Sequence, residues 1–444
     1  MITKNQEFDV EITGYSSDGQ GVARKDGFVI FVPFVATGEL VKVHIIKVTK
    51  SYAVGKVVEI VKSSEHRVLS KCEHFQKCGG CSIQHMCYKA QLDLKKQSVN
   101  DTLAKIGGFD NKGLVQEIVA SENQYFYRNK SAFPLFISQE QKLEICMFKG
   151  LSHDPIFIKQ CPITYEQNMR VAFAFRDAVN KFFNEAKHFM KYLVIRSLEN
   201  KILVTIVTTK HIKNAKVLYD AIKNDLNLDE KQFGLFECIK QKDNNVILEG
   251  KLNHLCGTYN IEIEIMNTKI SISPMSFFQV NFEVMQKIYE YVSTLIQSEI
   301  VVDCYSGAGL MSAILTKSAK QVYGIEIVED ATKDANILKE KNGIRNLENI
   351  NGDARVILPQ LQKKLDKFSL VIDPPRKGVS EEVINSILQS KPQNIVYVSC
   401  NPATLARDLK ALCQSVYQIE SVKAFDMFPQ TSHVETVAHL VLKK

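Results

Sequence analysis

The sequence lacks the features that would place the chain in a membrane or in a secreted class. No run of about 18 consecutive apolar residues occurs, so a transmembrane helix is not expected. The first ten residues are polar and contain no apolar signal segment. There is no convincing internal repeat and no low-complexity linker. These absences predict a cytoplasmic protein built from ordinary packed domains.

Length and composition predict globular domains in a reducing compartment. The chain has 444 residues, of which 45% are hydrophobic, and this suits two or three packed domains. Its 11 cysteines do not suggest a disulfide framework, because disulfides are rare in cytoplasmic proteins. Four of the cysteines gather between positions 72 and 87, and the others are scattered along the chain.

The net charge of +7 is unevenly placed along the chain. Residues 1–270 contain 37 Lys and Arg against 30 Asp and Glu, whereas residues 271–444 contain 19 of each kind. Two interpretations of this excess stay open. Either the N-terminal part binds a polyanion such as a nucleic acid, or the modest excess of positive charge only aids solubility.

Short runs rich in Val and Ile predict a small all-β barrel at the start of the chain. Gly, Asp and Pro turns separate the runs. We expect strands at 8–12, 27–32, 40–48 and 53–61. The segment resembles the TRAM domain, an OB-like module of RNA-modifying proteins, and OB-type barrels bind nucleic acid on an open face. The resemblance implies an RNA-binding domain over residues 1–62, unless the barrel is only a structural appendage.

A second domain is expected over residues 63–270. It begins with the clustered cysteines and continues with a helix over 88–106, which two glycines end. Further on, strand-like runs such as 201–208 alternate with a long helical run over 163–189. This pattern predicts a mixed α/β domain, and we find no catalytic motif in it.

Apolar strands and amphipathic helices alternate over residues 271–444, which predicts βαβ units and a parallel sheet. We expect strands at 300–303, 321–326, 370–373 and 394–399. In such sheets, ligands bind beyond the carboxyl ends of the strands. Asp303, Glu326, Asp373 and Cys400 all fall at these ends, so we expect the active site there.

A Gly-rich turn over residues 303–309 (Asp-Cys-Tyr-Ser-Gly-Ala-Gly) predicts a nucleotide site. Glycines let the backbone approach a ligand closely. Glu326 ends the next strand, and an acid at such a position accepts hydrogen bonds from ribose hydroxyls. Asp353 is placed to reach an adenine ring. The turn is not a P-loop, and it fits a dinucleotide fingerprint poorly.

Three further segments supply the groups that methylation of a pyrimidine at carbon 5 requires. Residues 399–402 (Ser-Cys-Asn-Pro) carry a thiol, residues 373–378 (Asp-Pro-Pro-Arg-Lys-Gly) lie upstream, and residues 433–435 (His-Val-Glu) carry a carboxylate. A thiolate that adds to carbon 6 of the ring makes carbon 5 nucleophilic. A base must then remove the proton from carbon 5.

With these motifs in this order, the chain resembles the RNA 5-methyluridine methyltransferase family, which uses S-adenosylmethionine. The resemblance spans essentially the whole chain. It implies that Cys400 is the nucleophile and that Glu435 is the base. Asp373 can be presented to the edge of the target base by its turn, which two prolines stiffen. Arg376 is a candidate for favouring the thiolate form of the cysteine.

The same resemblance implies a binding site for S-adenosylmethionine. Its expected contacts are Gln279, Tyr305, Glu326, Asp353 and Asp373. A duplex would hide the target ring, so the enzyme must splay the base out or take it from a loop.

The clustered cysteines have a spacing that is typical of metal sites. Cys72 is followed by Cys78, two glycines and Cys81, and Cys161 precedes a proline later in the chain. An all-thiolate set with a Cys-Pro ligand fits a [4Fe–4S] cluster, which family members with this pattern hold. Zinc stays the alternative, although zinc fingers usually have two short ligand pairs. Radical chemistry is not expected, because four ligands leave no open iron.

We therefore expect an α/β enzyme of three domains. They are a TRAM domain over 1–62, a central α/β domain with the iron–sulfur cluster over 63–270, and a Rossmann-like S-adenosylmethionine-dependent methyltransferase domain over 271–444. The expected substrate is a uridine of 23S ribosomal RNA, because barrel and cluster together resemble the ribosomal branch. Transfer RNA is the alternative.

Two other classes of protein are weighed against this expectation. A cytosine carbon-5 methyltransferase also uses a cysteine, but its usual motifs place the thiol differently. A non-catalytic iron–sulfur RNA-binding protein would not need Cys400 and Glu435, and both are intact. No membrane association and no obligate protein partner are expected.

Overall fold

The structure is a computed structural model that describes residues 2–110, 113–242 and 244–443. The chain folds into two compact units. Unit 1 comprises Met1–Gln124, Pro375–Val379 and Tyr397–Lys444, and unit 2 comprises Tyr125–Pro374 and Ser380–Val396. Within the described ranges, no helix combines the length and the apolar character that a membrane span needs.

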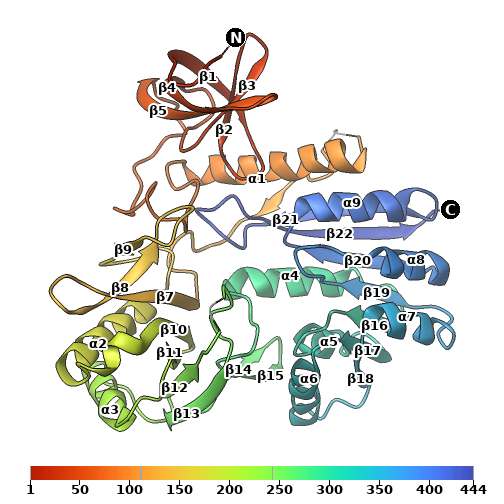
Figure 1. Cartoon of the computed structure of the whole chain (residues 1–444). Helices are drawn as coiled ribbons and strands as arrows, with labels where there is room; N and C mark the ends of the chain where they lie inside the picture. The colour runs from red at the N-terminus through yellow and green to blue at the C-terminus, as the bar shows by residue number, and fades with distance from the viewer. Residues whose placement is uncertain (1, 111–112, 243, 444) are drawn as a thin grey trace. The chain divides into compact units, whose positions relative to one another are not determined.

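The first strands of unit 1 close into the expected barrel, drawn in red in Figure 1. The strands are β1 (Glu7–Tyr15), β2 (Gly21–Lys25), β3 (Phe28–Val32), β4 (Leu40–Val48) and β5 (Tyr52–Lys62). Alternation puts Val10, Ile12 and Ile30 inside the barrel, where they are buried. Gly21 is required for close packing, because a Cβ there would lie 2.2 Å from Cγ2 of Val35. The barrel predicted from the sequence is confirmed.

A long helix follows the barrel in unit 1. An irregular segment with the clustered cysteines leads into α1 (Tyr88–Thr102), which continues as a π-helical turn, Leu103–Gly107. The chain then leaves the helix at Gly108, whose φ is 74°. The predicted helix over 88–106 is therefore confirmed, with a changed hydrogen-bond pattern in its last turn. α1 packs against α9 (Pro402–Cys413).

The sheet strands of unit 1 differ from the expected parallel pattern. The end of β20 (Asn394–Ser399), β22 (Glu435–Leu442), β21 (Tyr417–Phe425) and β6 (Ile118–Val119) follow one another in the sheet. β21 and β22 are antiparallel, and Phe425 lies opposite Glu435. A loop joins these two strands in place of a crossover helix, so they cannot run in the same direction.

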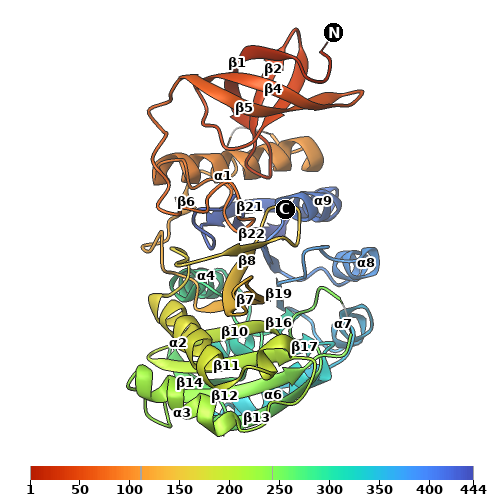
Figure 2. The same ribbon diagram turned by 60° about the vertical axis from the view of Figure 1, so that its left-hand side comes forward.

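Unit 2 contains a large mixed sheet with the order β13-β12-β11-β10-β7-β8-β9. Its strands are β7 (Lys130–Ile137), β8 (Leu143–Phe148), β9 (Pro155–Phe157), β10 (Met190–Leu198), β11 (Lys201–Thr208), β12 (Phe233–Ile239) and β13 (Lys251–Gly257). Helix α2 (Glu166–Phe182) packs across β8 and β10 (Figure 2), and α3 (Ala215–Asp225) packs beside it. The core between them includes Phe175 and Leu193, which are fully buried. The mixed α/β expectation is confirmed for this region.

A parallel sheet forms the remainder of unit 2, after the hairpin β14 (Ile261–Ile265) and β15 (Thr268–Ile272). Its strands are β16 (Ile300–Cys304), β17 (Gln321–Glu326), β18 (Leu347–Asn351) and β19 (Ser369–Ile372), in the order β18-β17-β16-β19, with the start of β20 next. Its helices are α4 (Phe282–Thr294), α5 (Leu310–Leu315), α6 (Glu329–Lys341), α7 (Ala354–Gln362) and α8 (Glu381–Ser390). The strands predicted here are confirmed to within one residue.

Candidate active site

The register of the parallel strands in unit 2 brings several predicted residues to one edge of the sheet. Cys304 at the end of β16 pairs with Ile325 of β17 and with Ile372 of β19. The next residues along the three strands are Tyr305, Glu326 and Asp373, and they lie at the same edge of the sheet, since parallel neighbours end side by side. Glu326 is still the last residue of β17, whereas Tyr305 and Asp373 directly follow their strands.

The Gly-rich turn adopts a backbone that few residues tolerate. Gly307 and Gly309 have φ of 55° and 79°, and Tyr305 has φ of 66° although it is not glycine. The Glu326 carboxylate accepts hydrogen bonds from the N–H of Gly307 at 2.9 Å and of Val328 at 2.8 Å. Glu326 therefore ties the turn to the following loop and holds its own carboxylate at the edge of the sheet.

Two acids of this edge differ in environment. Asp303 lies one residue inside β16, is only 2% exposed and accepts a 2.5 Å hydrogen bond from the Ser312 hydroxyl. Burial raises the pKa of Asp303 to about 7, although the Ser312 bond opposes the rise. Asp303 therefore braces the turn from within the sheet. Asp373 is exposed at the surface. Partial desolvation by the surrounding protein atoms raises the pKa of its carboxyl group.

Asp353 is held at the start of α7. Its side chain accepts a 2.9 Å hydrogen bond from the N–H of Arg355 and caps the helix. The guanidinium of Arg355 also donates to this carboxylate at 2.9 Å through Nε. Since Asn351 of β18 pairs with Glu326, Asp353 follows that edge of the sheet by two residues.

Gln279 lies in the loop between β15 and α4. The Asn129 side chain donates a 2.8 Å hydrogen bond to the Gln279 carbonyl, and the Asn129 N–H donates to the Val280 carbonyl at 2.9 Å. Asn281 then caps α4 by accepting from the N–H of Val284. Asn129 positions this loop, and no motif in the sequence around it indicates that role.

In unit 1, Cys400 sits at a turn between β20 and α9. The N–H of Asn401 donates to Ser399 Oγ at 3.1 Å, and the Asn401 side chain caps α9 by accepting from Ala403. Pro402 is the first residue of the helix, where proline is favoured. Partly buried Cys400 thus directly precedes the N-terminus of a 12-residue helix, whose dipole favours a thiolate.

The Asp-Pro-Pro-Arg segment is anchored next to this turn. Asn401 Nδ2 donates to the carbonyl of Arg376 at 3.0 Å, and Thr404 Oγ1 donates to the same carbonyl at 3.3 Å. The side chain of Arg376 is exposed. The backbone of this arginine is therefore fixed close to the start of α9.

Glu435 is the first residue of β22 and is only 5% exposed. It lies opposite Phe425, the last residue of β21. Because the crossover helix α9 joins β20 to β21, the ends of these two strands face the same edge. Glu435 and Cys400 therefore both lie at that edge of the unit 1 sheet.

The cysteines of the predicted cluster are divided between the units. Cys72, Cys78 and Cys81 lie in the irregular segment of unit 1, and their thiols form no disulfide. The N–H of Gly80 points at Cys78 Sγ with a distance of 3.4 Å. Cys161 belongs to unit 2 and packs against its core. Within the described ranges, no three His, Cys, Asp or Glu side chains gather as they would around a metal ion.

Comparison with known proteins identifies related chains over nearly the full length. The family model described as tRNA (Uracil-5-)-methyltransferase matches residues 87–444, and the model of the TRAM domain matches residues 3–58. A protein of Clostridium tetani named "Uncharacterized RNA methyltransferase" is 36% identical, over 98% of this chain and 96% of its own length. A protein of Halalkalibacterium halodurans with a similar name is 35% identical, over 100% of this chain and 98% of its own.

A solved structure shares the fold. The tRNA (uracil-54, C5)-methyltransferase of Pyrococcus abyssi, in complex with S-adenosyl-L-homocysteine, matches 98% of this chain and 100% of its own, with a TM-score of 0.78 and 27% identity. The fold is thus that of an S-adenosylmethionine-dependent methyltransferase with a TRAM barrel before it. With a family model matched over most of its length, this chain belongs to the tRNA (uracil-5-)-methyltransferase family of RNA methyltransferases.

Proposed function

We propose that this protein methylates carbon 5 of a uridine in 23S ribosomal RNA, with S-adenosylmethionine as the methyl donor. The observation that carries the proposal is the placement of Cys400 between the end of β20 and the capped start of α9. Membership in the family supports the reaction, and the TRAM barrel supports an RNA substrate.

The proposed chemistry assigns one step to each of two residues. The Cys400 thiolate adds to carbon 6 of the uracil ring, and the electron pair displaced onto carbon 5 forms the new bond to the methyl group. S-adenosylmethionine, when bound, supplies this electrophilic methyl group and leaves as S-adenosylhomocysteine. Glu435 then takes the proton from carbon 5, the carbon 5–carbon 6 double bond re-forms, and the thiolate leaves carbon 6.

Other residues prepare these steps. The dipole of α9 and the Arg376 guanidinium favour the Cys400 thiolate. Asp373 is exposed after β19 and can hydrogen-bond the edge of the target base.

We assign the methyl-donor site to the carboxyl edge of the parallel sheet in unit 2. Tyr305, Glu326 and Asp373 share that edge, Asp353 follows it, and Gln279 lies in the loop that Asn129 anchors. The P. abyssi relative, with S-adenosyl-L-homocysteine bound, supports a donor site in this fold. Glu326 and Asp353 are already oriented by backbone and arginine donors, so little ordering is needed on binding.

Transfer RNA is the second candidate substrate. The name of the P. abyssi relative specifies a tRNA uridine, and that protein matches 98% of this chain. The ribosomal proposal rests on the barrel combined with the cysteine spacing.

We propose three functional parts, with RNA binding over 1–62, the cluster segment over 63–270 and catalysis over 271–444. Because the proposed substrate is ribosomal RNA, we propose that the enzyme acts in the cytoplasm. We propose no obligate protein partner.

We further propose that Cys72, Cys78, Cys81 and Cys161 hold a [4Fe–4S] cluster. The N–H of Gly80 directed at Cys78 Sγ suits a thiolate-bound cluster. Because no metal-like group of side chains gathers among the described residues, the proposal rests on the spacing of the cysteines in the sequence. When bound, the cluster would organise the chain around it, and none of the steps above uses it.

Replacement of the nucleophile should abolish turnover without loss of the donor site. Cys400→Ala should lower methyl transfer at least about a thousand-fold, because no other group adds to carbon 6. Its affinity for S-adenosylmethionine, measured by calorimetry, should stay unchanged, and 5-fluorouridine RNA should trap only the wild type covalently. Cys413→Ala, on the same helix, serves as the control and should behave as the wild type. Retained turnover in Cys400→Ala would exclude this cysteine as the nucleophile.

Replacement of the base should stall the reaction at a later step. Glu435→Gln should still form the methylated adduct, but release of RNA should slow by about 100-fold or more, because a neutral amide does not accept the proton. Denaturing gels should show an RNA–protein adduct that carries the methyl label. Glu420→Gln, an exposed acid on neighbouring β21, should show none. Normal release by Glu435→Gln would require another base.

Metal analysis tests the cluster. Protein purified without oxygen should be brown and contain about four irons per chain. Cys78→Ser should remove the iron and the colour, whereas Cys87→Ser, which changes a neighbouring free thiol, should keep both. Stoichiometric zinc without iron in such preparations would refute the cluster.

A strain without the gene separates the two candidate RNAs. Its 23S ribosomal RNA should lack 5-methyluridine at one or more positions that the parent strain modifies, as mapped by mass spectrometry of nuclease fragments. Restoring the gene should restore the modification, and restoring the Cys400→Ala form should not. Loss of 5-methyluridine from transfer RNA alone would establish the tRNA alternative.

A further inference from the structure

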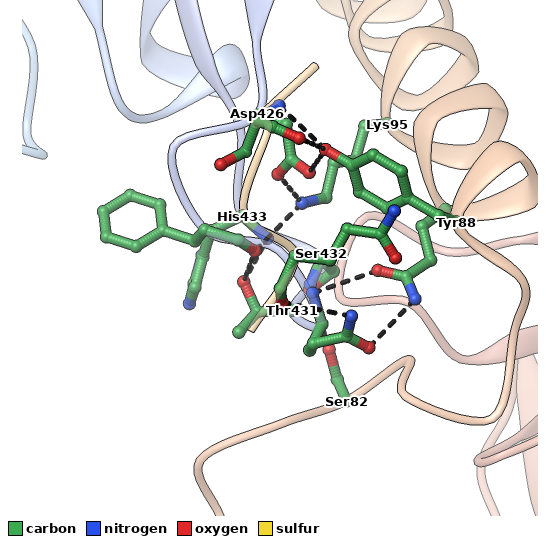
Figure 3. A network of polar contacts seen from close by, with 12 residues as sticks. Ser82, Tyr88, Lys95, Asp426, Thr431, Ser432 and His433 are labelled. Atoms are coloured by element: carbon green, nitrogen blue, oxygen red, sulfur yellow. Dashed lines mark hydrogen bonds and ion pairs between the residues drawn. The ribbon is translucent and has the colours of Figure 1, made fainter. Parts of the chain in front are cut away.

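The loop between β21 and β22 is held by several buried polar contacts. It runs over residues 426–434 and leads directly into Glu435. Side chains from α1 and from the segment before it converge on this loop, and Figure 3 shows Tyr88, Lys95 and Ser82 around it. All of these residues belong to unit 1.

A fully buried ion pair fixes the start of the loop. The Lys95 ammonium donates to the carboxylate of Asp426, and both side chains are 0% exposed (Figure 3). Lys95 Nζ also donates to the carbonyl of Phe428 at 3.0 Å, and Tyr88 Oη donates to Asp426 Oδ2 at 2.8 Å. A buried pair of this kind contributes little net stability compared with apolar side chains, but it defines one geometry.

A pair of glutamines fixes the middle of the loop. The N–H of Gln430 donates to Gln91 Oε1 at 3.0 Å, and Gln91 Nε2 donates to Gln430 Oε1 at 3.0 Å. Gln430 is 1% exposed and has a φ of 71°, in the left-handed region that disfavours side chains. Such a backbone persists only where its surroundings hold it, and Gln91 supplies part of that hold.

The cysteine segment holds the same part of the loop. The N–H groups of Ser82 and Ile83 donate to the Gln430 carbonyl at 3.1 and 3.2 Å. The N–H of Ser432 donates to Ser82 Oγ at 2.9 Å. Ser82 directly follows Cys81, so one of the proposed cluster ligands is next in sequence to a residue that holds the loop.

The contacts come from one helix face. Tyr88, Gln91 and Lys95 are spaced by three and four residues, which puts them on the same side of α1. Each of the three side chains contacts a residue between β21 and Glu435, and Tyr88 and Gln91 also bond to Ser121 and to the carbonyl of Met86. The polar face of α1 therefore holds the loop that leads into β22, whose first residue is Glu435.

We propose that Lys95, Gln91 and Ser82 are positioning residues for Glu435, and that they control the removal of the carbon-5 proton. This inference rests on the proposed role of Glu435 as the base. A shift of about 1 Å in a reacting group can slow its step by about 100-fold. The steps that depend on Cys400 and on the methyl donor use other elements of the chain, so they should be little affected.

The test removes the buried pair without leaving one charge unpaired. The double variant Lys95→Met with Asp426→Asn should form methylated adduct at about the wild-type rate, while release of RNA slows about 10- to 100-fold. Single-turnover reactions with methyl-labelled S-adenosylmethionine measure both rates. Gln91→Ala and Ser82→Ala, which change no charge, should show the same slowing to a smaller extent.

The control uses an exposed ion pair on the same helical segment. Lys105 pairs with Asp101 at 3.4 Å, and its side chain is 76% exposed. Lys105→Met with Asp101→Asn should leave both rates unchanged. If the double variant at Lys95 and Asp426 fails to fold, as judged by circular dichroism, the Gln91→Ala and Ser82→Ala variants decide the question. Equal slowing of adduct formation and release, or no slowing in these variants, would overturn the positioning role.

A parallel measurement on Glu435→Gln separates this inference from the proposed function. If Glu435→Gln accumulates adduct and the Lys95 and Gln91 variants do not, only the positioning role is wrong. If Glu435→Gln releases RNA normally, the assignment of the base is wrong, and the positioning role is wrong with it.

Discussion

The parallel pairing of β16 with β17 and β19 is the constraint on which the proposed methyl-donor site depends. Cys304 pairs with Ile325 and with Ile372, so the three strands end within one residue of one another. A slip of one residue would reverse which face each side chain occupies. The pairing therefore fixes at once which residues leave the sheet at the carboxyl edge and which, like Asp303, stay buried behind it.

The proposed reacting groups of unit 1 are placed by a different kind of interaction. Cys400 is set by a hydrogen-bonded turn and a capped helix, which are local in the sequence. Glu435 follows a nine-residue loop with no regular structure. The backbone pairing of strands therefore does not fix the conformation of the chain that leads into Glu435. Buried side-chain contacts from α1 hold this loop, and we propose that they position Glu435 for the removal of the proton.

The sequence was sufficient for features that depend on neighbours along the chain. Apolar runs bounded by turns predicted β11, β17 and β20, and the barrel followed from Val-rich runs. β18 was not predictable, because its sequence Leu-Glu-Asn-Ile-Asn is mostly polar. The contact between Lys95 and Asp426 was not predictable either, because the two residues are 331 positions apart in the sequence. Such long-range pairs leave no periodic pattern, and family resemblance supplied the roles of Cys400 and Glu435.

The fate of the hydrogen on carbon 5 tests the central claim most directly. RNA that contains uridine tritiated at carbon 5 should be incubated with the purified protein and S-adenosylmethionine carrying a labelled methyl group. The account predicts one tritium released to water for each methyl group that appears as 5-methyluridine. Methyl transfer without tritium release, or a methyl group found on a ribose oxygen or on cytidine, would contradict it.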